Sequence, residues 1–348
     1  MNGALHPGMD VILTKTTIKC YSSAGTSQLS NNVEDDPRDG GDWQTRQSPH
    51  KSSARNECPC GQQLSNESHI ELVEGNLNSP DSIRQIFERE KSAGGIWGVY
   101  CVLAYPGLGA NADGEERQGK MMADLALEYG VSTFVYSSAE RGGDENDENE
   151  KLSGQAKVAI ERHIKSLSGQ GLSWTIMRPG FFLDNYEGFI GSITVAVLKS
   201  GLKADVSLGV VDSVDIGCVA AAIFRKYKHK ELVVIGDVVT MAQQEEIYMR
   251  ATGRPLPAIP GFLGRMILAM NKATQELVKH FEMVHMARTT GQHENFQAQL
   301  QLTREAFPEM KSFHAWALTQ KSAPENAGET KAVGWNKISL WRLATGRM

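Results

Sequence analysis

Between His69 and Pro179 the chain alternates strand-length apolar runs with helical patterns, and this alternation limits the folds that it can adopt. The runs "HIELVEG", "GIWGVYCVLAY", "VSTFVYSSA" and "LSWTIMRPG" have the length of strands. Between them, "SPDSIRQIFERE", "EERQGKMMADLALEYG" and "GQAKVAIERHIKSLSGQG" have the spacing of helices. Strands that are apolar on both faces and joined by helices form parallel sheets covered on both sides. We therefore predict an α/β protein with a doubly wound parallel sheet.

The expected helices also carry boundary signals. Ser79 or Asp81 is placed to cap the first of them, and Gly130 follows the second where a left-handed residue commonly ends a helix. These signals support the division into strands and helices.

Small and polar residues follow the predicted strands. In doubly wound sheets the ligand lies outside the carboxyl ends of the strands. These ends carry Gly75-Asn76, Ala104-Tyr105, Ser137-Ser138 and Pro179–Phe182. We expect the ligand there, with either serine hydroxyl bonding a substrate or a ribose; without a base at known distance, neither serine is a candidate nucleophile.

Composition excludes several classes of function. The chain has 348 residues and a formal net charge of -5, without the clustered basic face that nucleic acid requires. Its longest apolar runs, such as Phe189–Leu198, are too short to cross a bilayer, and no secretory signal pattern precedes them. We expect an intracellular protein, cytoplasmic or nuclear, that contacts neither nucleic acid nor membrane directly.

The cysteines and histidines do not have the spacing of a metal site. Cys58 and Cys60 lack a second Cys/His pair to complete a zinc site, and His280 and His285 fall off one helical face. The odd number of cysteines, five, favours reduced thiols. We predict no metal.

Composition and apolar patterning divide the chain into four parts. We predict an aberrant, poorly ordered segment (1–54), a nucleotide-binding core (55–185), a C-terminal lobe (186–320) and a polar tail (321–348). The lobe includes the expected strand "ELVVIGD" and the expected helix "MAQQEEIYMRATG". The acidic run Glu140–Lys151 is predicted as a solvated loop over the mouth of the site.

Several blocks in one order resemble the NmrA-like family, atypical members of the short-chain dehydrogenase/reductase superfamily. The strongest are "ERQGKMMADLALEYGVSTFVYSSAERGG" and "KVAIERHIKSLSGQGLSWTIMRPGFFLDNY". The others are "IELVEGNLNSPDSIRQIF", "VDSVDIGCVAAAIF" and "SFHAWA", so the likeness runs from about Arg55 to Ala317. The resemblance implies a Rossmann-like sheet with a smaller C-terminal substrate lobe.

The resemblance also implies a cofactor and a choice of functions. Members of the family bind NADP(H) or NAD(H). Some resemble reductases of small aromatic or quinone-like substrates, and others are redox sensors that hold a transcription factor or an enzyme. We expect an NADPH-dependent oxidoreductase of a small organic substrate, with NAD(H) as the other cofactor; a sensor with a regulatory protein partner, or an inactive homologue, is the alternative.

Lys157 is the catalytic residue that the resemblance implies. In the wider superfamily a Tyr-x-x-x-Lys pair transfers a proton, and the lysine holds the nicotinamide ribose. Ser153 stands where that tyrosine would be, so the resemblance leaves Lys157 as base or ribose anchor. A surface lysine on an amphipathic helix is the alternative reading.

The resemblance assigns the adenosine half of the cofactor to three residues. Arg55 stands 21 residues before Asn76, the family's spacing for an arginine that meets the 2'-phosphate. Asn76 and Leu77 fall where the family has residues near the adenine. A loop arginine and a helix-capping asparagine are the alternatives.

The resemblance assigns five further positions to the cofactor. Ala104 and Tyr105 match a turn that packs on the cofactor ribose, and Arg117 opens the next helix, where relatives place a basic residue. Phe182 and Asn185 follow the strand where the family wraps the nicotinamide. Core aromatics and an exposed first-turn arginine are the alternatives.

The N-terminal segment departs from the family. Its first strand should lead into a glycine-rich turn that exposes backbone N–H groups to the pyrophosphate. "MDVILT", Met9–Thr14, resembles that strand, but Gly25 is the one glycine in the next stretch, Lys15–Ser27. Either the cradle has diverged or residues 15–54 are not the natural sequence, and we favour the second. In both cases we expect weaker dinucleotide binding than in relatives.

Overall fold

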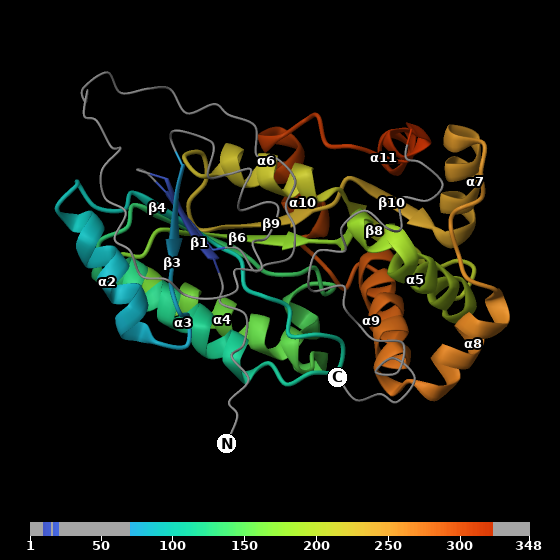
Figure 1. Ribbon diagram of the computed structural model, residues 1–348, viewed down its shortest axis with the longest axis horizontal. Helices are drawn as coiled ribbons and strands as arrows, with labels where there is room; N and C mark the ends of the chain where they lie inside the picture. Colours follow the sequence, from blue (N-terminus) through green and yellow to red (C-terminus); the bar gives the residue numbers. More distant parts are fainter. Residues whose placement is uncertain (1–9, 15–16, 21–69, 323–348) are drawn as a thin grey trace, which may run out of the picture.

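The computed structural model of the protein describes residues 10–14, 17–20 and 70–322. A seven-stranded sheet runs through its centre in the order β3-β1-β2-β4-β5-β6-β9 (Figure 1). These strands are β1 (Asp10–Thr14), β2 (Thr17–Cys20), β3 (Ile70–Glu74), β4 (Gly98–Cys101), β5 (Thr133–Ser137), β6 (Trp174–Pro179) and β9 (Lys230–Val234). Strands β2, β4, β5, β6 and β9 pair in parallel, which confirms the predicted parallel sheet.

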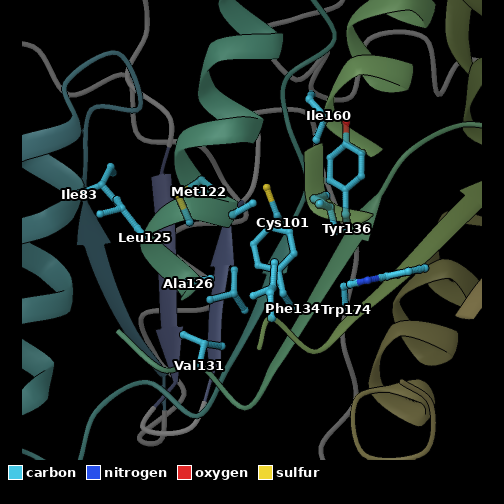
Figure 2. Close-up of a cluster of buried hydrophobic side chains, with 14 of the residues drawn as sticks. Ile83, Cys101, Met122, Leu125, Ala126, Val131, Phe134, Tyr136, Ile160 and Trp174 are labelled. Atoms are coloured by element: carbon cyan, nitrogen blue, oxygen red, sulfur yellow. The ribbon is translucent and has the colours of Figure 1, made fainter. Parts of the chain in front are cut away.

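Helices cover both faces of this sheet (Figure 1). One face carries α2 (Pro80–Lys91), α3 (Asp113–Glu128) and α4 (Ser153–Ser166), and the other carries α6 (Ser213–Ile223) and α10 (Phe296–Ala306). The strand β5 shows why: Phe134 and Tyr136 join the core under α3 and α4, while Val135 between them joins the core under α6. Figure 2 shows part of the first core. The predicted doubly wound arrangement is confirmed.

The helix ends agree with the sequence signals. Ser79 is the N-cap of α2, where its hydroxyl accepts a hydrogen bond from the Ser82 N–H. Gly130, with φ +67°, follows α3, and Gly171, with φ +108°, follows the 3₁₀ turn η2 (Leu167–Gln170) after α4. Only residues without a Cβ adopt such angles without strain, so the glycines fix these ends.

The remaining elements form a lobe beside the sheet. A small sheet has the order β10 (Asp237–Thr240), β8 (Ser207–Val211), β7 (Phe181–Phe182). The other elements of the lobe are η3 (Leu183–Tyr186), α5 (Gly188–Gly201), α7 (Met241–Thr252), α8 (Gly261–Met270), α9 (Lys272–Thr289), α11 (Phe313–Thr319) and η4 (Gln320–Ser322). Tyr186, Tyr248, Phe313 and Trp316 stack in its core.

The strand expected within the lobe at "ELVVIGD" lies elsewhere. It forms β9, which pairs in parallel with β6 at the edge of the main sheet. Helix α10 packs on β9, where the Thr303 hydroxyl donates to the Val233 carbonyl at 2.8 Å. The chain after residue 186 therefore contributes one strand and two helices to the main sheet.

The N-terminal strands differ from the expectation that Met9–Thr14 begins as the family's first strand. β1 is antiparallel to both neighbours, and the strand beside β4 is β2. A two-residue connection between β1 and β2 permits only a hairpin, because parallel neighbours require a long crossover. The β-branched residues of "VILT" and "TTIKC" explain why strands form within a segment that is polar on average.

Candidate functional site

The carboxyl ends of β2, β4, β5 and β6 meet at one edge of the main sheet, as their parallel registers require. Helices α3 and α4 follow β4 and β5, so both begin at this edge (Figure 1). A helix N-terminus carries a partial positive charge and unbonded N–H groups, and it favours anionic groups. The edge is therefore suited to hold carboxylates or a phosphorylated ligand.

A glycine brings the two helices into close contact one turn inside this edge. A Cβ at Gly119 of α3 would lie 2.5 Å from the Ile160 side chain of α4, so no larger residue fits without a shift. Glu115 lies one turn before Gly119, and Lys157 lies one turn before Ile160. The contact thus places these two side chains within reach of each other.

Glu115, Ser153 and Lys157 form a compact polar cluster at the edge. The Lys157 ammonium donates to Glu115 Oε1 at 2.5 Å, and the Ser153 hydroxyl donates to Glu115 Oε2 at 2.6 Å. Glu115 is buried, whereas 15% of the Lys157 side chain is exposed. The predicted site lysine is therefore held by a carboxylate from the neighbouring helix.

Two tyrosine hydroxyls lie within the field of this carboxylate. Burial and the nearby Glu115 charge raise the pKa of Tyr105 to about 12, although half of the residue (51%) is exposed. Burial and Glu115 also raise the pKa of Tyr136 well above its usual value. In Figure 2 the Tyr136 hydroxyl is directed to the end of the core where Ile160 lies, and it makes no hydrogen bond among the described residues. Both phenols stay protonated at neutral pH and can donate.

The predicted adenine residues lie beyond β3 at the same edge. The Asn76 side-chain oxygen accepts from the Asn78 N–H at 2.9 Å, and its backbone N–H donates to the Ser82 hydroxyl. Leu77 is buried in the core under α2 and α3. Asn76 therefore closes a local turn while Ser79 caps the helix. Their contact with a cofactor stays a prediction.

The other predicted residues are spread along this edge. Ala104 is half-buried beyond β4, and Arg117 is exposed and makes no hydrogen bond or ion pair with a described residue. Phe182 is partly exposed in β7, and Asn185 is half-buried in η3. Arg55 lies outside the described residues. The structure therefore brings two of the predicted residues, Lys157 and Tyr105, near the Glu115 carboxylate. No hydrogen bond or ion pair joins the other described candidates to it.

The acidic run Glu140–Lys151 is only partly the solvated loop that its composition predicted: Asp144, Glu145, Glu148, Asn149 and Lys151 are exposed, whereas Glu140–Gly143 and Asn146 are buried. Arg141 is buried and bonds Glu161 of α4 through Nη1 and Nη2 at 2.8 and 2.9 Å. Its Nε donates to Asp147 at 2.7 Å. Lys151 also pairs with Glu276 of α9 at 3.1 Å. The buried ion pairs of Arg141 therefore hold the run against α4, whereas the exposed Lys151–Glu276 pair contributes little.

Arg178, at the end of β6, completes this network. Its Nη2 donates to Glu161 Oε2 at 2.6 Å and to Asp144 Oδ1 at 2.5 Å. Burial alone would raise the pKa of Glu161, but the guanidiniums of Arg178 and Arg141 hold it at about 2. The pKa of Arg178 is raised because Glu161 outweighs the burial. This network is closed and serves the architecture of the edge.

Comparison with known proteins shows the family of this chain. A family model described as the NmrA-like family matches residues 46–317, which is most of the chain. The chain belongs to the NmrA-like family. No curated protein matches its sequence.

Solved structures place this NmrA-like chain among related folds. NmrA, a negative transcriptional regulator, matches with a TM-score of 0.53 and 15% identity over 78% of this chain and 87% of NmrA. A nucleoside-diphosphate-sugar epimerase from Staphylococcus aureus matches with a TM-score of 0.50 and 13% identity over 70% and 82%. The Citrobacter sp. triphenylmethane reductase, solved with NADP(H), has a TM-score of 0.48 and 13% identity over 71% and 82%. The first two show a shared Rossmann-like fold.

Sequence reasoning missed Glu115 in this NmrA-like chain. The available signal was its place in the first turn of a helix, four residues before a glycine in the helix interior. Such a glycine marks a close approach to a neighbouring element, and a carboxylate one turn away can reach that neighbour. The partner lysine, however, could be chosen only from the three-dimensional contact.

The described residues contain no group of three His, Cys, Asp or Glu side chains placed to hold a metal ion. None of the helices in the described ranges is long and apolar enough to cross a membrane.

Proposed function

We propose that this chain binds NADPH, or NADH, along the carboxyl edge of the sheet and reduces a small organic substrate there. The observation that carries the proposal is the Lys157 ammonium, held by Glu115 where two parallel strands end and two helices begin. A cation fixed at this place in a doubly wound sheet is suited to bind ribose hydroxyls. The lobe after residue 185 bounds the substrate side in this proposal.

The residues of the edge fit the nicotinamide half of the cofactor. An ammonium has three N–H donors, and Glu115 is the one described hydrogen-bond acceptor of Lys157. The Ser138 hydroxyl and the Tyr136 hydroxyl are buried at the end of β5 and have no hydrogen-bond partner among the described residues. Such orphaned groups indicate a place where a polar ligand or water completes the hydrogen bonding.

The fit to the pyrophosphate half is poorer. A pyrophosphate cradle needs a helix N-terminus directly after the first strand. Here β1 and β2 form a hairpin, so no helix separates them, and Gly25 and Arg55 lie outside the described residues. We therefore expect dinucleotide binding to be weaker than a complete phosphate cradle would give.

The chemistry divides between cofactor and chain. Reduced nicotinamide supplies a hydride when it is bound. Lys157 holds the ribose and donates a hydrogen bond or a proton to the substrate oxygen that gains charge. Ser153 does not replace the missing tyrosine as donor, because its proton is already shared with Glu115.

Replacing Lys157 tests this proposal. Lys157→Ala should lower NADPH consumption with a carbonyl, quinone or enone substrate by about 100-fold or more, the usual scale for a proton-transfer group. Lys151→Ala is the matched control, because Lys151 is exposed and pairs only with Glu276 among the described residues. Turnover retained by Lys157→Ala would remove the assigned role.

The second candidate is a non-catalytic redox sensor that binds a regulatory protein. It is favoured by one observation: Ser153 stands at the tyrosine position and its hydroxyl bonds Glu115 instead of facing a substrate. Nucleotide binding without turnover on any substrate of the panel, together with a protein partner that is recovered only with one redox form of the nucleotide, would support the sensor.

A further inference from the structure

We infer that Glu115 is the positioning residue of Lys157, and that Ser153 acts through Glu115 rather than on a substrate. The inference rests on the proposed function only where it concerns a dinucleotide; the geometry of the three side chains stands apart from it. It assigns a function to the serine that replaces the superfamily's tyrosine.

The position of Glu115 is fixed from three directions. It lies in the first turn of α3, where the positive end of the helix stabilises a carboxylate. It is 4% exposed, so the surrounding core limits its rotamers. The Ser153 hydroxyl holds Oε2 at 2.6 Å and so leaves Oε1 aimed at Lys157.

Glu115 restrains one N–H group of Lys157, and the other two have no acceptor among the described residues. A lysine side chain has four rotatable bonds and loses rotamer entropy when it is ordered. The 2.5 Å contact with Glu115 orders it before a ligand arrives. A ligand at the exposed part of Lys157 therefore meets an ammonium that is already in place.

Apolar contacts dock α3 on α4 beside the ion pair. Gly119 lies against Ile160, and Met122, Leu125 and Ala126 of α3 belong to the same buried core as Ile160 and Ile164 of α4. A pair on the same helix shows the difference: Glu116 and Lys120 join at 2.6 Å, but both are more than one third exposed. That surface pair contributes little, and it offers a matched control.

The test compares Glu115→Gln with Glu116→Gln, and its first measurement does not need a cofactor. An amine-specific reagent labels each lysine at a rate that peptide mass spectrometry can follow. An ion-paired ammonium must leave its carboxylate before it reacts. Glu115→Gln should speed labelling of Lys157 several-fold and leave Lys120 unchanged, whereas Glu116→Gln should leave Lys157 unchanged and alter the labelling of Lys120 only slightly. Equal labelling of Lys157 in the wild type and Glu115→Gln would overturn the inference.

Calorimetric titration with NADPH is the second measurement. Glu115→Gln should weaken binding about tenfold, and the double variant with Lys157→Ala should bind no worse than Lys157→Ala alone. Additive losses would show that Glu115 acts independently of Lys157 and would contradict the inference. If the wild type binds no dinucleotide, the proposed function fails and the labelling result still decides the role of Glu115.

A variant that keeps the charge guards against misfolding. Should Glu115→Gln fail to fold, Glu115→Asp draws the carboxylate back by one methylene. Lys157 should then be labelled at a rate above that of the wild type, with the melting temperature lowered by only a few degrees. An unchanged labelling rate in folded Glu115→Asp would contradict the positioning role.

Discussion

Two buried glutamates at the same edge of the sheet are bonded in different ways. Glu161, four residues after Lys157 on α4, receives hydrogen bonds from both Arg141 and Arg178 and is 1% exposed. Glu115, on α3, receives one from Ser153 and one from Lys157. A guanidinium is a rigid fork that fills both oxygens of a carboxylate, whereas an ammonium spends one donor and keeps two. Glu161 with Arg141 and Arg178 is therefore a closed cluster, in which arginines occupy both carboxylate oxygens. Glu115 with Ser153 and Lys157 is an open cluster, in which the ammonium keeps donors for a ligand.

The difference separates architecture from chemistry. The closed cluster joins the loop after β5, helix α4 and the end of β6, so it fixes the edge on which a ligand lies. The open cluster lies near the Tyr105 hydroxyl and near the Tyr136 hydroxyl, which has no hydrogen-bond partner among the described residues. Polar groups are therefore available there for a ligand. Substitutions in the closed cluster should therefore lower the free energy of unfolding, and substitutions in the open cluster should weaken ligand binding.

The largest effect is expected from opening the closed cluster. Glu161→Ala removes the fully buried carboxylate that Arg141 and Arg178 share and leaves them Asp144, Asp147 and Glu231, so it should lower the free energy of unfolding by about 3 kcal/mol. Urea unfolding measures this change. Arg162 lies on the same helix as Glu161, and its exposed side chain pairs with Asp147. Arg162→Ala should therefore lower the free energy of unfolding by less than about 1 kcal/mol. Equal losses for Glu161→Ala and Arg162→Ala would mean that the buried cluster stabilises the fold no more than an exposed ion pair does.

The pH dependence of the closed cluster follows from its lowered pKa values. Burial opposes the shift, but Arg178 and Lys165 hold the pKa of Asp144 at about 2, like that of Glu161. A carboxylate whose pKa is lower in the folded state stabilises the fold above its unfolded pKa of about 4, and this contribution disappears as the pH falls towards 2. The stability difference between wild type and Glu161→Gln should hold from pH 7 to about 5 and shrink below pH 4. A difference that stays constant down to pH 2 would contradict the assignment.

A smaller effect is expected from separating the helices that carry the open cluster. Gly119→Val places a Cβ 2.5 Å from Ile160 and should cost about 1–3 kcal/mol. Gly114→Ala is the control, because a Cβ there meets nothing within 4 Å, and alanine favours a helix by about 0.5–1 kcal/mol. Thermal unfolding should therefore move in opposite directions for the two variants. Unchanged NADPH binding by folded Gly119→Val would show that the open cluster does not depend on this contact.

The sequence predicts the core of the fold because its signals there are local. The runs around Phe134 and Trp174 are apolar on both faces, and Ser79 and Gly130 fix helix ends through their own backbones. The position of β9 depends on a pairing with β6 more than 50 residues away, which no local pattern reveals. The β1–β2 hairpin lies in a segment whose average composition conceals its strand-forming residues.

The site is predicted less completely for the same reason. The family resemblance of its own segment assigns Lys157, but its partner Glu115 is 42 residues distant. The composition of Glu140–Lys151 predicts solvent exposure, but Arg141 in that run pairs with the distant Glu161, and Asp144 pairs with Arg178. The charge of a segment alone predicts exposure to solvent, whereas ion pairs with residues distant in the sequence decide which of its side chains are buried.

Calorimetric titration of the chain with NADPH and then NADH, repeated with Lys157→Ala, decides whether Lys157 holds a dinucleotide at the carboxyl edge of the sheet. We expect saturable binding with one site per chain, weakened about tenfold or more by the substitution. Heats no greater than dilution for both nucleotides, or equal affinity in the wild type and Lys157→Ala, would contradict this expectation.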